Sequence, residues 1–494
     1  MSEFPDYDEI HVISDIHMGG KPGFQILRQT GRLANFIGWV GARRPTERVA
    51  LILNGDIIDT LAEDTNGYIA VDNALPILDR IMGDSAFAPV WDALAAFVKR
   101  EGRRLVFAIG NHDIEIAFPN VQWRLLERLC GDDARARARV EFSTAGAGYA
   151  CTVGHARVFC THGNEVDAWN FNRYEELSKA ARRINSARGL PLDEWTANAG
   201  TRMVKDVMNE VKKRYAWIDL LKPENSAAIG TLLALDPSQL GKLSKLPAIV
   251  GRQAVDATQV DQRLSAEGLH APAPTAAVPS LESLLGPNVL ESMQSVGARP
   301  GRTGDEMLAA LELDSTDRPV NTFGDAPLGA GQLVWDRLTG WLTGVSPDEA
   351  LRRALQDWLK NDTTFDLAAA DATYAETVKK LGSAVNFVVT GHTHLERAID
   401  MGAGRFYFNC GTWIRLVRFT EAMLAGSAVF KPIYDVLKTG SMAALDDAHF
   451  NGQSLVLDRT SAVSISLENG HAVGRLTHVI GDGSGQPEIV KQFS

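Results

Sequence analysis

The chain has 494 residues, with 45% hydrophobic and 22% charged side chains and a formal net charge of -11. Its length excludes a single ordinary hydrophobic core, so we expect two domains or one globular domain with a large insertion. The negative charge disfavours nucleic acid as a partner, because the phosphate backbone repels an acidic protein and no long Lys/Arg run is present to override the repulsion.

The sequence gives no targeting or membrane signal. Residues 1–9 lack the charged-then-apolar layout of a signal peptide, and no apolar run reaches the ~20 residues that span a bilayer. The four cysteines show no metal-binding spacing. Cys151 and Cys160 could face each other across a hairpin, but a cytosolic protein would keep them reduced. We therefore expect a cytoplasmic protein, with peripheral membrane contact as an alternative.

Strands and helices alternate in the first part of the chain, which is typical of an α/β layer fold. Residues 139–162 then alternate in polarity and predict a hairpin that ends at His162. Segment 60–83 shows no clear periodicity and is expected to be looser. The predicted strands are 8–14, 48–53 and 105–109, and the predicted helices are about 24–41 and 88–100.

A long stretch between His162 and the next buried strand is mainly helical in pattern. Apolar residues recur at helical spacing in 201–217 and in 351–359, and Ser346 is a plausible N-cap for the second of these helices. Residues near 268–280 are rich in Pro and Ala and predict a tether. These features indicate an insertion over residues 165–383.

The chain after the insertion returns to strand patterns. We expect a hairpin over 396–408, a loop at 409–413 and a helical stretch to about Leu445. A last hairpin, over 462–467 and 473–480, turns at Asn469-Gly470. We expect this hairpin to complete a second sheet.

Five short polar stretches directly follow apolar runs that predict buried strands. Loops beyond the carboxyl ends of strands in an open α/β sheet converge on one crevice, so these stretches are expected to meet. Their carboxylate, amide and imidazole groups suit Mn, Fe, Zn or Mg and indicate a two-metal hydrolytic site. We expect the side chains of His392 and His394 to lie on the same side of an extended segment. The stretches are Ser14-Asp15-Ile16-His17, Gly55-Asp56-Ile57-Ile58-Asp59, Gly110-Asn111-His112-Asp113, Thr161-His162-Gly163 and Gly391-His392-Thr393-His394.

In order and residue types, these stretches resemble the motifs of the calcineurin-like metallophosphoesterase superfamily. The resemblance covers residues 8–164 and 384–413. It implies a four-layer α-β-β-α sandwich whose discontinuous core comprises 1–164 and 384–494, with 165–383 as a lid or assembly domain.

The resemblance also implies roles for individual residues. His112 would protonate the leaving oxygen or stabilise charge on the phosphate, and Asp59 would hold the tautomer of His112. Asp113, in contrast, is expected to order the turn after its strand. Two divalent ions are implied, with Mn favoured and Fe, Zn, Ni or Mg as alternatives. Asp56 would bridge the two ions, with Asp15, His17 and His394 on one ion and Asn111, His162 and His392 on the other.

A narrower resemblance concerns the substrate. Residues 162–167, 391–394 and 409–413 are similar in layout to the UDP-2,3-diacylglucosamine hydrolase branch, whose insertion forms a helical lid over a lipid-linked nucleotide. This sequence departs from that branch in having His112 where the branch has Arg, Leu395-Glu396 in place of Arg-Pro, and a much longer insertion.

We therefore expect a phosphodiesterase or pyrophosphatase that uses a metal-activated hydroxide on a nucleotide-linked or lipid-linked small molecule. A cyclic-nucleotide phosphodiesterase or nuclease of the same superfamily is the alternative. A non-catalytic binding scaffold is a third hypothesis, disfavoured because none of the motif's ligands is missing. A less favoured interpretation is that the insertion contacts lipid. The sequence does not determine the oligomeric state.

Overall fold

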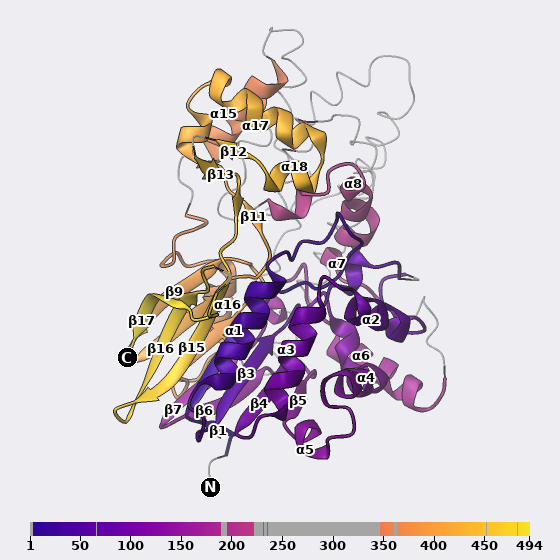
Figure 1. Cartoon of the computed structure of the whole chain (residues 1–494), viewed down its shortest axis with the longest axis vertical. Coiled ribbons are helices and arrows are strands. Elements are labelled where there is room, and N and C mark those ends of the chain that lie inside the picture. Colours follow the sequence, from indigo (N-terminus) through magenta and orange to yellow (C-terminus); the bar gives the residue numbers. More distant parts are fainter. Residues whose placement is uncertain are drawn as a thin grey trace, which may run out of the picture.

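A computed structural model describes residues 3–65, 67–188, 195–221, 231, 235, 346–359, 363–450, 452–481 and 483–494. The predicted tether near 268–280 lies outside the described residues. Figure 1 shows a sandwich of sheets and helices, with a separate helical group at one end of it.

The first sheet has seven strands in the order β17-β16-β15-β2-β3-β4-β5. Strands β2 to β5 run parallel, as expected for a layer fold, while β15, β16 and β17 are antiparallel to their neighbours. The strands are β2 (Glu9–Ile13), β3 (Val49–Asn54), β4 (Arg103–Ala108), β5 (Val140–Ser143), β15 (Ser461–Glu468), β16 (His471–His478) and β17 (Glu488–Phe493).

The last hairpin, β15 and β16, forms at the predicted turn but joins the first sheet. Val463 of β15 pairs with Val12 of β2, so the prediction that this hairpin completes a second sheet was wrong. A hairpin pattern predicts which two strands pair across the turn. It does not predict which sheet they join, because both sheets of a sandwich have an edge where a strand with buried faces can pair. The sequence therefore does not indicate the sheet edge to which this hairpin adds.

The second sheet has six strands in the order β1-β6-β7-β8-β10-β9. β7 and β8 are parallel neighbours, with Val158 opposite Phe387, so strands from before and after the insertion lie side by side. Cys160 is opposite Tyr149 rather than Cys151, and all four cysteines are free and buried. The strands are β1 (Asp6–Tyr7), β6 (Tyr149–Val153), β7 (Ala156–Cys160), β8 (Phe387–Thr390), β9 (Glu396–Gly402) and β10 (Arg405–Cys410).

Apolar side chains from both sheets form one buried cluster between them, including Val12, Ile52, Val158 and Phe408. Helices cover the outer face of each sheet. Phe36 of α1 belongs to a second cluster with the first sheet, and α16 packs on the second sheet. The layers are thus helix, sheet, sheet and helix, so the predicted α-β-β-α sandwich is confirmed. The helices of the core are α1 (Thr30–Ala42), α2 (Ala74–Gly83), α3 (Ala88–Lys99), α4 (Pro119–Cys130), α5 (Ala134–Arg137) and α16 (Ala372–Lys379).

Two of these helices differ from the sequence prediction. α1 begins at Thr30 rather than near 24, because the preceding segment is held by polar contacts such as Gln25 to Asp84. α2 lies in the segment expected to be looser; Pro76 obscured its pattern, although proline is tolerated in a first helical turn. Among the described residues no single helix has the length and apolar composition of a membrane span, and only α2 and α3 taken together, bent by 96°, meet that criterion.

The helical group has a hydrophobic core of its own, built from segments far apart in the sequence. Residues 199–221 pack in one cluster with parts of 346–359 and 414–457. The predicted boundary of the insertion stays a prediction, but residues after 384 also contribute to this group. Its elements are α7 (Ala199–Met203), the π-helical turn η5 (Val204–Met208), α8 (Asn209–Lys212), η6 (Ile218–Leu220), α15 (Pro347–Leu359), α17 (Ser427–Thr439), α18 (Met442–Asp446), β11 (Leu416–Val417), β12 (His449–Phe450), β13 (Gln453–Ser454) and β14 (Val456–Leu457), with α6 (Tyr174–Asn185) packed nearer the core.

The predicted helix 201–217 is broken in the structure. It contains the π-helical turn and ends at Lys212, five residues early. Trp217 is fully buried and donates from its indole nitrogen to the carbonyl of Leu437 at 3.1 Å, so tertiary packing overrides the helical pattern.

Candidate metal centre

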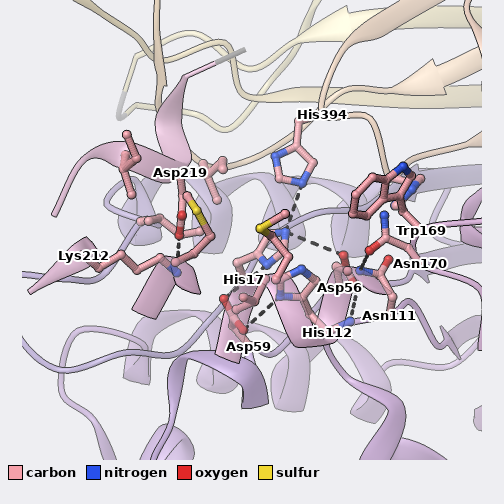
Figure 2. Close-up of a pocket in the computed structure, with 18 residues that line it drawn as sticks. His17, Asp56, Asp59, Asn111, His112, Trp169, Asn170, Lys212, Asp219 and His394 are labelled. Carbon is pink, nitrogen blue, oxygen red and sulfur yellow. Dashed lines mark hydrogen bonds and ion pairs between the residues drawn. The ribbon is translucent and has the colours of Figure 1, made fainter. Parts of the chain in front are cut away.

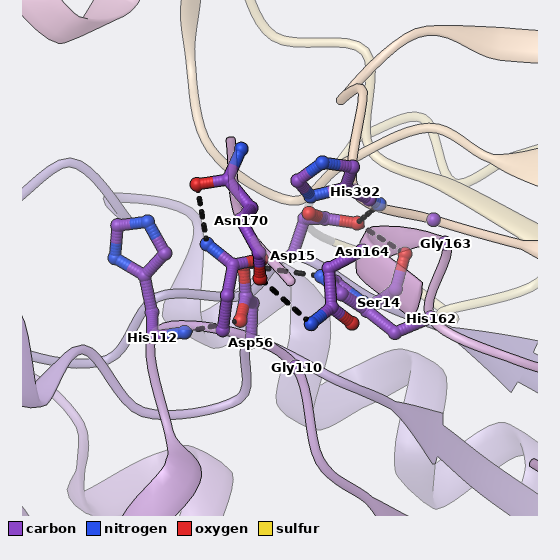
Figure 3. A network of polar contacts seen from close by, with 12 residues as sticks. Ser14, Asp15, Asp56, Gly110, His112, His162, Gly163, Asn164, Asn170 and His392 are labelled. Carbon is purple, nitrogen blue, oxygen red and sulfur yellow. Dashed lines mark hydrogen bonds and ion pairs between the residues drawn. The ribbon is translucent and has the colours of Figure 1, made fainter. Parts of the chain in front are cut away.

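The polar stretches predicted from the sequence meet at one edge of the sandwich. Asp15 and His17 follow β2, and Asp56 follows β3. Asn111 and His112 follow β4 in the same way. From the second sheet, His162 follows β7, while His392 and His394 follow β8. Figures 2 and 3 show these side chains gathered around one centre.

Five of these residues have left-handed backbone conformations, which non-glycine residues rarely adopt. Such a conformation costs about 1–3 kcal/mol per residue and persists where the surroundings enforce it, often at functional sites. The predicted extended geometry of His392-Thr393-His394 was therefore wrong, because both histidines lie at turns of the chain. The φ angles are 52° for Asp15, 51° for His17, 55° for Asp56, 70° for His392 and 60° for His394.

Glycines in the motifs allow the loops to approach closely. A Cβ atom at position 110 would clash with the carboxylate of Asp56, and one at position 391 would clash with Ser14 and Asp15. Gly110 and Gly391 are therefore required by close packing of the loops.

Asp15, His17 and His394 form the first cluster of donor atoms. Nε2 of His394 lies 3.2 Å from Nε2 of His17 and 3.2 Å from Oδ1 of Asp15. The other oxygen of Asp15 accepts the Ser14 hydroxyl and the backbone N–H of His392, the latter at 3.0 Å. These bonds hold the Asp15 carboxylate so that Oδ1 faces the two imidazoles.

Asp56 lies between this cluster and His162. Its Oδ1 accepts the backbone N–H of His112 at 2.8 Å, while its Oδ2 lies 3.2 Å from Nε2 of His162 and 3.8 Å from Nε2 of His17. One carboxylate oxygen therefore faces histidines of both groups, as a bridging ligand would.

Two buried polar atoms of the second group point toward the centre: among the described residues Oδ1 of Asn111 has no hydrogen-bond partner, and Nε2 of His162 faces the Asp56 carboxylate. Nδ1 of His162 lies 2.8 Å from the carbonyl of Asn54, so an Nδ1–H donor leaves the lone pair on Nε2. Burial alone would lower the pKa of His162, but the Asp56 carboxylate raises it to about 10. A cation in place of that proton would satisfy both atoms, so the residues fit divalent metal ions.

His112 lies at the edge of this cluster, with Nδ1 3.1 Å from Oδ1 of Asp59. Burial alone would lower the pKa of His112, but the carboxylates of Asp59 and Asp56 raise it to about 9. Asp113 orders the turn as predicted, since it accepts the backbone N–H groups of Gly110 and Ile57, each at 2.7 Å. Burial and the neighbouring Asp56 charge raise the pKa of Asp113 to about 7.

Comparison with known families agrees with this geometry. Residues 9–218 match the family model described as calcineurin-like phosphoesterase. This region belongs to the calcineurin-like phosphoesterase family. With the Asp/His clusters, the match supports a metal-dependent phosphoesterase activity. His392 and His394 lie beyond the matched residues, and the structure brings them to the same centre. No curated protein matched the chain.

Two further residues of the phosphoesterase centre, Asp167 and Asn170, were not predicted to have a role in it. Oδ2 of Asp167 lies 2.8 Å from Nε2 of His392 and accepts Nδ2 of Asn170 at 2.6 Å. Asn170 in turn faces Asn111, with 3.5 Å between Asn111 Nδ2 and Asn170 Oδ1 (Figure 2). Asp167 ends the stretch 162–167 that resembles the hydrolase branch, and Asn170 follows that stretch closely.

A cavity that is partly open to solvent lies over the phosphoesterase centre (Figure 2). Its floor is formed by the acidic, amide and imidazole groups just described. Polar side chains of its upper wall are Asn170, Lys212 and Asp219, and the latter two form an ion pair. The apolar side chains of the wall are Ile26, Trp169, Met203, Val204, Met208, Ile218 and Ile414.

Proposed function

We propose that this phosphoesterase hydrolyses a phosphodiester or pyrophosphate bond in a nucleotide-linked or lipid-linked small molecule. The observation that carries this proposal is the two-part cavity, whose floor is acidic and imidazole-rich and whose wall is largely apolar. A phosphoryl group matches the floor once cations are bound, and an apolar portion of the substrate matches the wall.

We propose that two divalent ions, with Mn favoured, are held by the seven residues that the sequence singled out. When bound, such ions polarise a phosphoryl oxygen and lower the pKa of water so that it can attack phosphorus. The chain's own contribution is to fix the ligand atoms. Asp56 is held through Oδ1 by His112, Asp15 through Oδ2 by His392, and His162 through Nδ1 by Asn54.

His112 is the proposed acid for the leaving oxygen. Asp59 occupies Nδ1 of His112, and its carboxylate favours the protonated imidazole. Nε2 is then the atom left to donate a proton to the departing alkoxide. Asp59 thus favours the form of His112 that can act as an acid.

The cyclic-nucleotide or nuclease alternative has one observation in its favour. The indole of Trp169 lines the cavity and could stack on a nucleobase. A polymeric nucleic acid fits less well, because Lys212 is the only Lys or Arg among the described residues that line the cavity.

A substrate panel tests the proposal. Purified protein with Mn is assayed on bis-p-nitrophenyl phosphate, UDP-sugars, cyclic nucleotides and single-stranded DNA, with Asp56→Asn as the inactive control. We expect turnover of bis-p-nitrophenyl phosphate and of UDP-sugars. Hydrolysis of DNA without hydrolysis of UDP-sugars would contradict the proposal and favour the nuclease alternative.

A further inference from the structure

We propose that Lys212 binds a second negatively charged group of the substrate, remote from the phosphorus under attack, and that Asp219 holds its place until the substrate arrives. This inference rests on the proposed function, since it concerns specificity within the same cavity. It makes Lys212 a specificity-determining residue for substrates that carry an additional phosphate or similar anion.

Lys212 differs in its surroundings from the other lysines of the same helical segment. Lys213, the next residue, is 69% exposed and pairs with Glu210 at the surface. Lys205 turns inward, but its ammonium donates to the backbone carbonyl of Glu63 at 2.8 Å and so ties the helix to the core. Lys212 is 16% exposed and lines the cavity, where its ammonium contacts the carboxylate of Asp219 (Figure 2).

The surroundings explain why this lysine has a partner. Met203, Val204, Met208 and Ile218 line the same wall, and a charge placed among apolar groups is costly unless it is paired. Asp219 lies in the short helix η6, and its side chain is 23% exposed. The pair therefore faces the cavity, where an incoming anion can reach Lys212 while Asp219 turns toward water.

Charge balance indicates what such an anion would be. Two divalent ions and a protonated His112, set against the attacking hydroxide and the carboxylates of Asp15, Asp56 and Asp59, leave about one net positive charge at the floor, which a single phosphodiester charge neutralises. A second anionic group needs a cation elsewhere in the cavity, and Lys212 supplies it. An uncharged substrate portion would leave the Lys212–Asp219 pair intact and gain nothing from it.

The test uses two substrates that differ only in the remote group: thymidine 5′-(p-nitrophenyl phosphate) with and without a 3′-phosphate. Both have the same leaving group and the same nucleoside. We expect Lys212→Met to raise KM for the 3′-phosphorylated substrate about 10- to 100-fold, the range for losing a charge-assisted hydrogen bond, with kcat little changed. KM for the substrate without the 3′-phosphate should change less than about 3-fold.

Two further variants sharpen the test. Lys213→Met removes the same charge one residue away and should leave both KM values unchanged. Asp219→Asn removes the carboxylate that contacts Lys212 and should lower KM for the 3′-phosphorylated substrate. An equal effect of Lys212→Met on both substrates, or no effect on either, would overturn the inference. If the wild-type protein with Mn hydrolysed neither substrate nor bis-p-nitrophenyl phosphate, the proposed function itself would fail.

Discussion

The two carboxylate oxygens of Asp56 have different partners. Oδ1 is fixed by the backbone N–H of His112, and Oδ2 faces both His162 and His17. Asp56→Asn removes the negative charge between the two groups of ligands, so we expect loss of both metal ions and of turnover. Metal content per chain, measured by inductively coupled plasma mass spectrometry alongside activity, checks this prediction. A variant that retained two ions would show that Asp56 is not the bridge.

His112 is expected to affect chemistry without affecting metal content. His112→Ala should lower kcat by about 10²- to 10⁴-fold on substrates with alkoxide leaving groups, because such groups need a proton. Substrates that release p-nitrophenolate need less protonation and should be less affected. If His112→Ala stripped the metal instead, the role assigned to His112 would be wrong.

Asp167 is expected to act through His392. Its carboxylate lies 2.8 Å from Nε2 of His392 and so favours an Nε2–H tautomer, which leaves Nδ1 as the ligand atom. Asp167→Asn should weaken binding of one of the two ions about 10- to 100-fold, as outer partners of metal ligands usually do when mutated. Calorimetric titration with Mn measures this directly. Asp206→Asn, which removes a carboxylate that bonds Tyr68, is the matched control.

Glu9 links residue charge to the pH dependence of stability. It is buried against His11, Arg43 and Arg44. Burial alone would raise the pKa of Glu9, but His11 and Arg43 hold it well below the usual range. Ionised Glu9 therefore stabilises the fold at pH above its unfolded-state pKa of about 4.3, and this contribution is lost as the pH falls toward the folded-state value.

The corresponding variant is Glu9→Gln, which leaves the arginines without their buried partner. We expect it to lower the free energy of unfolding at pH 7 by about 1–3 kcal/mol, less than for a fully buried ion pair because water reaches Arg43 and Arg44. The difference from wild type should shrink as the pH falls below about 4. Denaturant unfolding of both proteins at pH 7 and pH 3.5 measures it, and a difference that grew at low pH would contradict the assignment.

At the scale of elements, the segment α7-η5-α8 connects the core to the cavity. Its polar side bonds the loop after Asp59, with Lys205 donating to the Glu63 carbonyl and Asn209 donating to the Leu61 carbonyl at 3.0 Å. Its apolar side chains, including Met203 and Met208, line the cavity. The segment is therefore a rigidly docked wall of the site.

This wall gives a test that separates apolar from polar substrates. Alkyl p-nitrophenyl phosphates of increasing chain length share one leaving group, and each methylene buried on the wall should lower KM by up to about 4-fold. Met208→Asp should weaken the dependence of KM on chain length and leave KM for the methyl ester nearly unchanged. A KM independent of chain length in the wild type would exclude an apolar subsite on this wall.

The success of sequence prediction also differed between elements. Strands β2, β3 and β4 were predictable because each is a short apolar run that ends at a polar motif residue. Helix α2 was missed because Pro76 hid its pattern, and the helix expected to reach residue 217 ends at Lys212 because Trp217 is buried against Leu437. Local periodicity does not contain such tertiary contacts.

At the scale of the whole molecule, the convergence of the motif residues was predictable, because strand ends of a layered sheet meet at one edge. The contribution of Asn170 and Lys212 was not predictable, since each is a single polar residue without a motif, and the stretch 162–167 did not indicate that Asp167 would contact His392. The helical group was also beyond prediction, because its core joins segments separated by hundreds of residues, such as 199–221 and 414–457.

We propose that two metal ions lie side by side at the ends of the strands. Crystals grown with Mn and measured at the Mn absorption edge test it most directly, through an anomalous difference map. We predict two peaks about 3.5–4 Å apart on either side of Asp56, one beside Asp15, His17 and His394 and one beside Asn111, His162 and His392. A map with no peak, or with a single peak away from Asp56, would contradict the account.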